Sequence, residues 1–392
     1  MADYPIQQLD NKTPLQYAKK DNIDFLAQHS EVGLVKTIPD GIPPGSDAAN
    51  LSVMGYNPRE YYTGRSPLEA ISMGINLSDT DVAIRCNLVT LSEDEDYNQK
   101  TMIDYSSDEI STEEARELIN EVNRHLKSQN INFYPGISYR HCMVWNNGAT
   151  GLNLTPPHDI LEKKIANYLP KGENTKLLLD MMVKSYDILK NHPVNKARIS
   201  KGLRPANSIW LWGEGKKPLL SKYYDKYKIN GSVISAVDLI KGIGILAGLK
   251  NVDVEGATGN IHTNFIGKAQ AALKELESGQ DFIYLHFEAP DECGHRYEIE
   301  NKVKSIEIID EQVVGTILKG LEKYEDYRLL ILPDHPTPLS LRTHTSDPVP
   351  YLLYQKSKPK MSGIAGYDEV QAASTNIFFE EGYRLMDHFI LD

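Results

Sequence analysis

Short apolar runs alternate with amphipathic stretches over the last third of the chain. Residues 282–287 and 329–332 are continuous apolar runs bounded by turn-forming or charged residues, as in strands buried on both faces. Residues 236–247, 267–276 and 298–324 instead repeat their apolar positions at helical spacing. This alternation predicts an α/β fold in which helices sandwich a mostly parallel sheet.

The pattern changes between residues 88 and 212. Residues 91–112 are acidic and rich in turn formers, and an amphipathic helix is predicted at residues 112–125. Further helices are predicted at residues 161–168 and 175–190, and strands at residues 131–133, 139–145 and 208–212, the last ending at Gly213. We therefore predict an inserted α+β domain over residues 88–212, within a core domain made of residues 1–87 and 213–392.

A turn-rich segment near the amino terminus follows a predicted helix at residues 14–29 and a strand at residues 32–35. The cluster Pro43-Pro44-Gly45 forces irregular backbone just before Ser46, where a new helix begins. A serine at that place meets converging backbone N–H groups, which favours the binding of a phosphate or an oxyanion. The alternative is that Ser46 only caps the helix.

Candidate metal ligands follow two of the predicted strands. Asp334 and His335 come directly after one strand, and His344 lies on the same Pro- and Thr-rich loop. Asp291 and His295 follow the preceding strand and share a face if their segment is helical. Ligands collect at the carboxyl edge of open α/β sheets, and carboxylate and imidazole suit Mn, Zn or Fe.

Each of these pairs alone is more typical of a solvated loop or an ordinary surface pair, but their convergence on one edge favours two divalent cations. The predicted ligand sets are Asp291, His295 and His344 for one ion, and Asp334, His335 and the hydroxyl oxygen of Ser46 for the other. Two such ions can ionise a serine and neutralise charge during an in-line phosphoryl displacement.

Composition narrows the class of protein. The chain has 392 residues, of which 41% are hydrophobic and 24% charged, as expected of a globular protein with about two domains. Its formal net charge of −12 argues against a nucleic-acid partner but not against a small anionic substrate. We find no apolar run that could span a membrane and no signal peptide, and the three cysteines are scattered. We therefore expect a cytoplasmic protein without a membrane partner.

Several blocks of sequence, spread over nearly the whole chain, match one known family. The blocks are PPGSDAANLSVMGYNP, YYTGRSPLEA, DVAIRCNLVTL, ANSIWLWGEG, GATGN, HTN, DECGH, DHPTP and HTSDPVP. The chain resembles the archaeal-type, cofactor-independent (2,3-bisphosphoglycerate-independent) phosphoglycerate mutases of the alkaline phosphatase superfamily. The resemblance implies an alkaline-phosphatase-like core with an inserted lid domain, and the two ligand sets given above.

The same resemblance implies the reaction. A phosphoryl group would move between the 3- and 2-hydroxyls of glycerate through a phosphoserine at Ser46, in glycolysis and gluconeogenesis, without bisphosphoglycerate. The expected cofactors are two divalent metal ions, Mn²⁺ first, with Zn²⁺, Co²⁺ or Mg²⁺ as alternatives. The expected partner is a small phosphorylated substrate, and the oligomeric state stays open.

Cationic side chains in the matched blocks are candidates for binding that substrate. A guanidinium group fits both phosphate and carboxylate, so we single out Arg85 first, then Arg65, Arg140 and Arg204. His158 could reach the substrate from the inserted domain. The alternative for each arginine is a structural or surface role. Trp210 and Trp212 are interpreted as packing or hinge residues.

The sequence departs from the family pattern in two places. Family members begin with an apolar strand ending in Asp-Gly-Met, whose Asp ligates the second metal, whereas this chain reads Met1-Ala2-Asp3. The DHPTP and HTSDPVP blocks also resemble a bacterial subgroup proposed to act as a homoserine kinase. A kinase using the same metal site is therefore the alternative function, and a metal-binding protein left inactive by the missing Asp is a further alternative.

Overall fold

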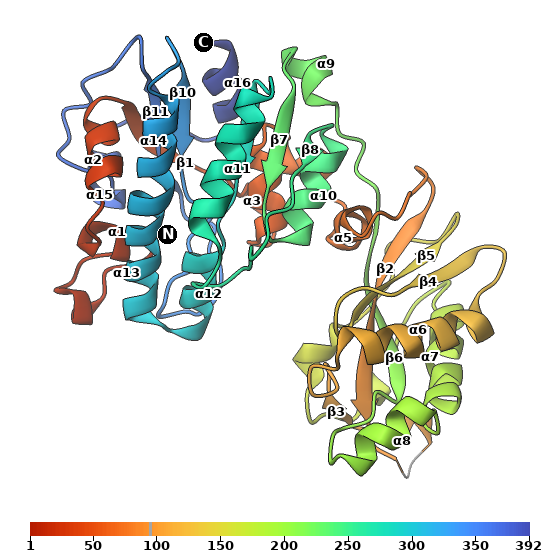
Figure 1. Ribbon diagram of the computed structural model, residues 1–392. Coiled ribbons are helices and arrows are strands. Elements are labelled where there is room, and N and C mark those ends of the chain that lie inside the picture. The colour runs from red at the N-terminus through yellow and green to blue at the C-terminus, as the bar shows by residue number, and fades with distance from the viewer. Residues whose placement is uncertain (94–95) are drawn as a thin grey trace. The chain divides into compact units, whose positions relative to one another are not determined.

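The computed structural model describes residues 1–93 and 96–392, which form two compact units (Figure 1). The first unit is Met1–Tyr62 with Leu219–Asp392, and the second is Thr63–Pro218. The boundaries predicted from the sequence, at residues 88 and 212, lie inside strands β2 (Val82–Leu91) and β6 (Ser208–Lys216). Because these two strands pair along their lengths, they belong to one unit.

The first unit contains two sheets and most of the helices. Its strands are β1 (Glu31–Val35), β7 (Gly231–Ile234), β8 (Lys250–Asn251), β9 (Phe282–Leu285), β10 (Arg328–Ile331), β11 (Val349–Gln355) and β12 (Phe378–Phe379). Its helices are α1 (Pro14–Tyr17), α2 (Asp21–Gln28), α3 (Ser46–Val53), α4 (Pro58–Tyr61), α9 (Tyr223–Tyr227), α10 (Asp238–Leu246), α11 (Phe265–Glu277), α12 (Ala289–Arg296), α13 (Ile299–Ile308), α14 (Gly315–Leu321), α15 (Glu369–Ser374) and α16 (Arg384–Leu391).

The strands of the first unit are arranged differently from the single sheet that we predicted. One sheet has the order β8-β7-β9 and is parallel, whereas the other has the order β10-β11-β1-β12. In the second sheet β11 runs antiparallel to both of its neighbours, so β10 and β1 point the same way. Strands β9 and β10, which precede the candidate ligands in the chain, therefore lie at the edges of separate sheets.

A long helix covers the sheets of the first unit. It runs through α13, a π-helical segment (Ile309–Val314) and α14, in agreement with the helix predicted at residues 298–324. Buried apolar side chains from this helix, from α2 and from β11 form one core cluster. Figure 1 shows α11, α13 and α14 in front of the sheets, with α3 behind them.

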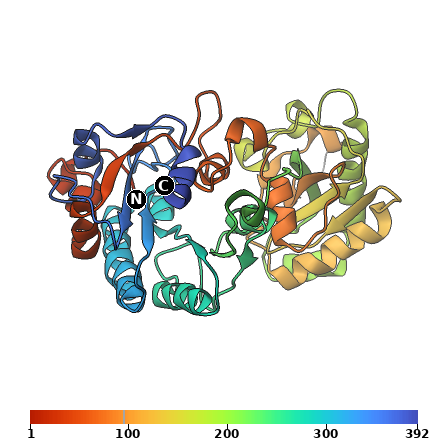
Figure 2. The ribbon, with the colours of Figure 1, turned by 90° about the horizontal axis from the view of Figure 1, so that it is seen from above.

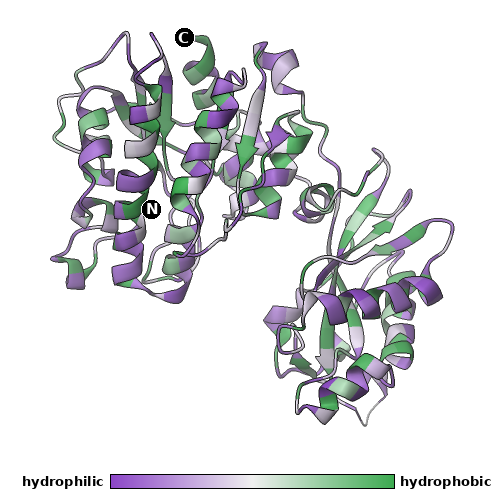
Figure 3. Ribbon diagram, viewed as in Figure 1, coloured by the Kyte–Doolittle hydropathy of each residue, from purple (hydrophilic) through white to green (hydrophobic). Residues whose placement is uncertain are grey.

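The second unit is an α+β structure around an antiparallel sheet. Its strands are β2, β3 (Met102–Asp104), β4 (Ile131–Tyr134), β5 (Arg140–Trp145) and β6, in the order β3-β2-β5-β4 with β6 also paired to β2. Its helices are α5 (Ser66–Ser72), α6 (Thr112–Leu126), α7 (Lys176–Leu189) and α8 (Pro193–Ser200). In Figure 3 the outer face of α6 is largely hydrophilic and β2 is largely hydrophobic.

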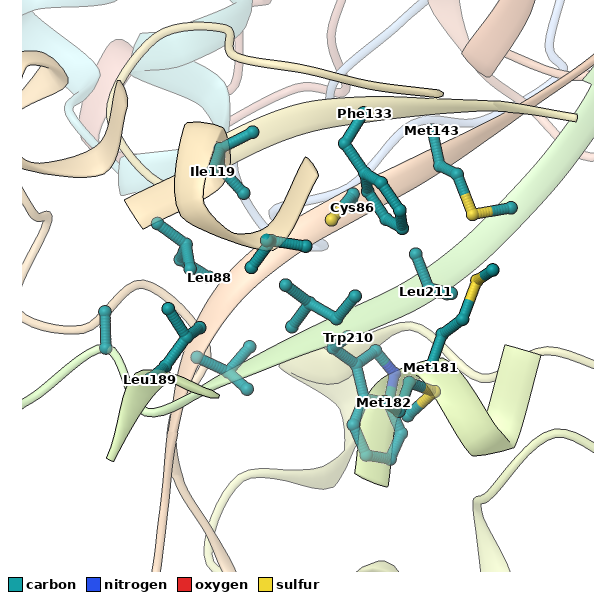
Figure 4. Close-up of a cluster of buried hydrophobic side chains, with 14 of the residues drawn as sticks. Cys86, Leu88, Ile119, Phe133, Met143, Met181, Met182, Leu189, Trp210 and Leu211 are labelled. Carbon is teal, nitrogen blue, oxygen red and sulfur yellow. The ribbon is translucent and has the colours of Figure 1, made fainter. Parts of the chain in front are cut away.

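The core of the second unit lies between this sheet and the helices. Figure 4 shows side chains of β2, β4, β5 and β6 meeting those of α6 and α7. Trp210 is part of this core and donates its indole N–H to the carbonyl of Thr155 at 2.8 Å, which agrees with a packing role.

Two of the predicted elements are wrong. Residues 161–168 hold only a short 3-10 turn (Ile165–Asn167), and β6 continues past Gly213 to Lys216.

One further element differs from the prediction because the backbone leaves helical geometry. The helix predicted at residues 14–29 is broken into α1 and α2, with the buried Lys20 at φ −144° between them. Among the helices that the structure describes, none is long and apolar enough to cross a membrane.

Candidate active site

The candidate metal ligands and Ser46 lie together in the first unit. Ser46 is the first residue of α3, Asp291 and His295 belong to α12, and the other three lie on the loop after β10. One ligand atom from each of Asp291, His335 and His344 lies within 4.8 Å of the other two. Residues from opposite ends of the chain therefore form one cluster.

The Asp291 carboxylate lies at the centre of this cluster. Its two oxygens lie 3.3 Å from Nε2 of His295 and 3.3 Å from Nε2 of His344. The two imidazole Nε2 atoms are themselves 2.9 Å apart. This geometry brings together the three residues of the first predicted ligand set.

His335 links the first set to the second. Its ring centroid lies 4.0 Å from that of His344, and its Nε2 atom lies 3.0 Å from Oγ of Ser46. The same Nε2 atom lies 3.5 Å from a carboxylate oxygen of Asp334. The structure thus places Ser46, Asp334 and His335 together.

The electrostatics of the site keep Asp291 and Asp334 ionised. Burial raises the pKa of Asp291, but its contacts with His295 and His344 outweigh burial and hold that pKa well below its usual range. The contact with Asp291 raises the pKa of His295 to about 9. Burial lowers the pKa of His335, which favours its neutral form. Burial also raises the pKa of Glu288, just before α12, to about 8.

This donor set fits divalent cations. Neutral imidazole nitrogens and ionised carboxylate oxygens are the ligands of Mn, Zn and Fe sites. Three imidazoles and two carboxylates face one another here, and a bound cation would offset the negative charge that Asp291 and Asp334 concentrate at this site.

Several residues that orient the ligands are not among the predicted site residues. Thr337 donates its hydroxyl hydrogen to Asp291. Asn50 donates to Asp334 at 2.8 Å and to the backbone carbonyl of Ser46 at 2.8 Å, and accepts a hydrogen bond from Tyr284 at 2.5 Å. Both residues stand in blocks quoted above, but their roles depend on contacts across the fold that no local spacing reveals.

A glycine lets α12 approach the loop after β10. A Cβ atom added at Gly294 would lie 2.5 Å from the carbonyl oxygen of Thr337. A side chain at this position would therefore push that loop away from α12, and with it His335 and its contact to Ser46.

A buried ion pair also contacts the loop after β10. Lys302 donates to Asp3 at 2.7 Å and to the carbonyl of Thr337 at 2.8 Å, and both charged side chains are almost fully buried. Asp3 also accepts the backbone N–H of Leu339 at 3.2 Å. Asp3 is therefore committed to this pair rather than to the cluster of candidate metal ligands.

In the second unit, two of the candidate substrate residues gather around Trp212. Arg85 lies 4.5 Å above the Trp212 ring and donates to Glu69, with one contact at 2.8 Å. The His158 ring lies 5.4 Å from Trp212, and burial lowers the pKa of His158. Trp212 itself donates to Asn87 at 2.9 Å.

Arg140 borders this group through two tyrosine rings. It lies 5.7 Å from the Tyr139 ring, which contacts Tyr105, and Tyr105 in turn contacts His158. Arg204 instead pairs with Asp104 at 3.1 Å and with Asp108 at 3.3 Å. Arg65 lies directly before α5. The structure thus brings Arg85, Arg140 and His158 together and gives Arg204 a structural role.

Comparisons with known proteins agree with one another. A family model described as 2,3-bisphosphoglycerate-independent phosphoglycerate mutase matches residues 27–195. A probable 2,3-bisphosphoglycerate-independent phosphoglycerate mutase of Geobacter sulfurreducens is 51% identical over 387 residues, which cover 99% of this chain and 96% of the relative. The 2,3-bisphosphoglycerate-independent phosphoglycerate mutase of Methanosarcina barkeri is 47% identical over 95% of this chain and 92% of the relative.

Two solved structures are also similar. The PH0037 protein from Pyrococcus horikoshii has a TM-score of 0.83 at 29% identity, over 99% of this chain and 93% of that chain. The cofactor-independent phosphoglycerate mutase from Thermoplasma acidophilum has a TM-score of 0.66 at 23% identity, over 99% of this chain and 96% of that chain, which is a likeness of fold.

The buried ion pair generates a prediction on stability. Lys302→Met leaves Asp3 buried without its counter-charge, so we expect the free energy of unfolding to fall by about 3–5 kcal/mol in urea titrations. The control is Lys304→Met on the same helix, where the side chain is 59% exposed and the expected loss is below about 0.5 kcal/mol. Equal losses for the two variants would contradict the role of the pair.

Proposed function

This chain belongs to the family of 2,3-bisphosphoglycerate-independent phosphoglycerate mutases, and we propose that it interconverts 3-phosphoglycerate and 2-phosphoglycerate through a phosphoserine at Ser46. The observation that carries the proposal is the position of the Ser46 hydroxyl, 3.0 Å from His335 and inside a cluster of carboxylates and imidazoles. The kinase and inactive-protein alternatives are not favoured by relatives that are 45–51% identical and bear the mutase name.

Two displacements at phosphorus account for the reaction. Ser46 Oγ gives up its proton and forms a bond to phosphorus while the bond to the 3-oxygen of glycerate breaks, and that oxygen takes up a proton. The 2-hydroxyl then gives up its proton and attacks the phosphoserine, while the bond between phosphorus and Ser46 Oγ breaks and Oγ takes up a proton. The phosphoryl group and the proton count are conserved, so neither ATP nor water is consumed.

We propose that two divalent cations, Mn²⁺ before Zn²⁺, Co²⁺ or Mg²⁺, bind at this edge. The residues that would hold them are Asp291, His295 and His344 for one ion, and Asp334, His335 and Ser46 for the other. Such ions would lower the pKa of the serine hydroxyl and neutralise the phosphoryl oxygens. Asn50 positions Ser46 and Asp334 through its amide, and Thr337 orients Asp291.

We also propose that Arg85, Arg140 and His158 bind the anionic groups of the substrate. The support is their grouping around Trp212, Tyr139 and Tyr105 in the second unit. Arg65 stays a candidate because it directly precedes α5, and Arg204 is the weakest because two aspartates already neutralise it. A cytoplasmic location is supported by the three cysteines, which are unpaired and buried.

The assay that tests the function uses the purified full chain with Mn²⁺. We expect conversion of 3- to 2-phosphoglycerate in the absence of ATP and bisphosphoglycerate, followed by NMR of the phosphorus nucleus. ATP-dependent phosphorylation of homoserine without mutase activity would overturn the proposal. Ser46→Ala should abolish turnover because it removes the nucleophile, and it should leave binding of the ion held by Asp291, His295 and His344 intact. Ser52→Ala on the same helix is the matched control, and it should keep activity.

The raised pKa of His295 predicts that metal binding depends on pH. His295, with a pKa of about 9, is protonated at pH 7.5 in the metal-free protein, and a ligand imidazole must be neutral. Mn²⁺ should therefore release about one proton at pH 7.5, and its affinity should fall about tenfold per pH unit below pH 9. Calorimetry in buffers of different ionisation enthalpy measures that proton. Release of the same proton by the His295→Gln variant would contradict the assignment of this proton to His295.

The grouping around Trp212 predicts an effect on substrate binding. Arg85→Lys keeps the charge but loses the fork that can grip an anion, so KM should rise about tenfold or more with a smaller change in kcat. The control is Arg124→Lys on α6, where the side chain is 69% exposed. An unchanged KM for Arg85→Lys in a protein with unchanged Tm would remove Arg85 from the substrate site.

A further inference from the structure

The side-chain amide of Asn87 lies among the candidate substrate residues of the second unit, which can be followed from above in Figure 2. Asn87 is two residues after Arg85 on β2, and Arg85 pairs with Trp212 on the neighbouring strand β6. Side chains two positions apart on a strand share a face of the sheet, so Arg85, Asn87 and Trp212 lie on one face. Asn87 is 4% exposed, so its amide needs partners within the protein.

Both halves of this amide have a partner that fixes its orientation. Its Oδ1 atom accepts the indole N–H of Trp212 at 2.9 Å, and its Nδ2 atom donates to the backbone carbonyl of Tyr105 at 3.3 Å. An indole nitrogen only donates and a carbonyl oxygen only accepts, so the amide cannot turn over without losing both bonds. Asn87 therefore ties β6 to the segment that follows β3.

The same two partners flank His158. The centroid of the His158 ring lies 5.4 Å from that of Trp212 and 6.1 Å from that of Tyr105, and the ring stands at 75° to each. Edge-to-face contacts of this kind favour one ring orientation over others. The side chain of Asn87 thus acts on His158 through both of its aromatic neighbours.

The backbone around His158 gives its ring little support. His158 belongs to a single 3-10 turn, Pro157–Ile160, which follows Pro156. Short 3-10 turns have poorer hydrogen-bond geometry than α-helices. The orientation of the His158 ring therefore depends on the side chains that pack against it.

The segment around Tyr105 is a firm anchor for the amide. The Asp104 carboxylate accepts the backbone N–H groups of Ser106 at 2.8 Å and of Asp108 at 2.7 Å, which orders the turn after Tyr105. Ser107 and Asp108 in this turn have φ of 50° and 55°, left-handed values that such residues keep only where their surroundings hold them. The amide is thereby bonded to a rigid piece of backbone.

We propose that Asn87 is a positioning residue for the substrate site. It holds the Trp212 and Tyr105 rings so that the imidazole between them keeps the orientation in which it binds an anionic group of the substrate. The inference rests on the proposed function, because it takes His158 and Arg85 as substrate-binding residues. It adds a residue that acts through its neighbours.

The test replaces Asn87 with leucine, which has a similar size and neither donor nor acceptor. In the substrate-free protein, we expect the indole N–H of Trp212 to exchange with solvent about tenfold faster or more, as measured by NMR. The indole N–H of Trp210, bonded to the carbonyl of Thr155, is the internal control and should keep its exchange rate.

The imidazole of His158 provides a second measurement. Burial lowers the pKa of His158, while Asp159 acts to raise it and Arg85 to lower it. Looser rings let water reach the imidazole, so in Asn87→Leu the pKa of His158 should rise toward its ordinary value. An NMR titration measures this pKa, with the signal assigned by its loss in His158→Gln.

Kinetics connect the position of the ring to the reaction. With 3-phosphoglycerate as substrate, Asn87→Leu should raise KM about fivefold or more and change kcat by less than about twofold. The matched control is Asn195→Leu, which removes a buried amide of the same unit that donates to the carbonyls of Leu189 and Ala206, both at 2.9 Å. This control should leave KM and the titration of His158 unchanged.

Trp212→Phe breaks the same hydrogen bond from the other side and keeps an aromatic ring. It should move the His158 titration in the same direction, and it serves as the test if Asn87→Leu does not fold. An unchanged His158 titration in both variants, or equal changes in Asn195→Leu, would overturn the positioning role. If the unaltered chain lacks mutase activity but the two NMR changes occur, the hold of Asn87 on His158 is supported and the proposed reaction is overturned.

Discussion

The carboxylate of Asp291 is the contact on which the candidate active site depends. It meets His295 on its own helix, His344 on the distant loop and the hydroxyl of Thr337. Without it, His295 and His344 would lose the carboxylate that both contact, and α12 would lose one of its polar links to the loop after β10. The close approach at Gly294 and the Lys302–Asp3 pair fix the backbone on which this contact rests.

The main features of this site could be predicted from sequence because the candidate ligands follow the carboxyl ends of strands. Asp291 and Asp334 each follow an apolar run that forms a strand, and the structure brings them to one edge. The separation of β9 and β10 into two sheets could not be predicted from apolar runs, since a run records burial and not the identity of the neighbouring strand. The partners of Lys302 and Asn50 were missed for a related reason. Their contacts join residues 299 and 284 positions apart.

The second unit shows how an acidic protein can gather cationic side chains in one place. The chain carries a net charge of −12, yet Arg85 and Arg140 each lie beside an aromatic ring, and Arg85 also pairs with Glu69. These arginines could be identified by residue type, but residue type alone does not distinguish them from Arg204. The distinction comes from the acidic neighbours of Arg204, Asp104 and Asp108, which lie about a hundred residues earlier in the chain.

The distance along the chain between Ser46 and His335 has a consequence for biosynthesis. These residues touch across 289 positions, and the second unit is the continuous stretch Thr63–Pro218 between them. At ribosomal rates of about 5–20 residues per second, Ser46 waits roughly 15–60 s for its partner. The second unit can fold during that interval, whereas the catalytic edge can form only when translation is nearly complete. A nascent chain halted before His344 would therefore carry a finished second unit and no active site.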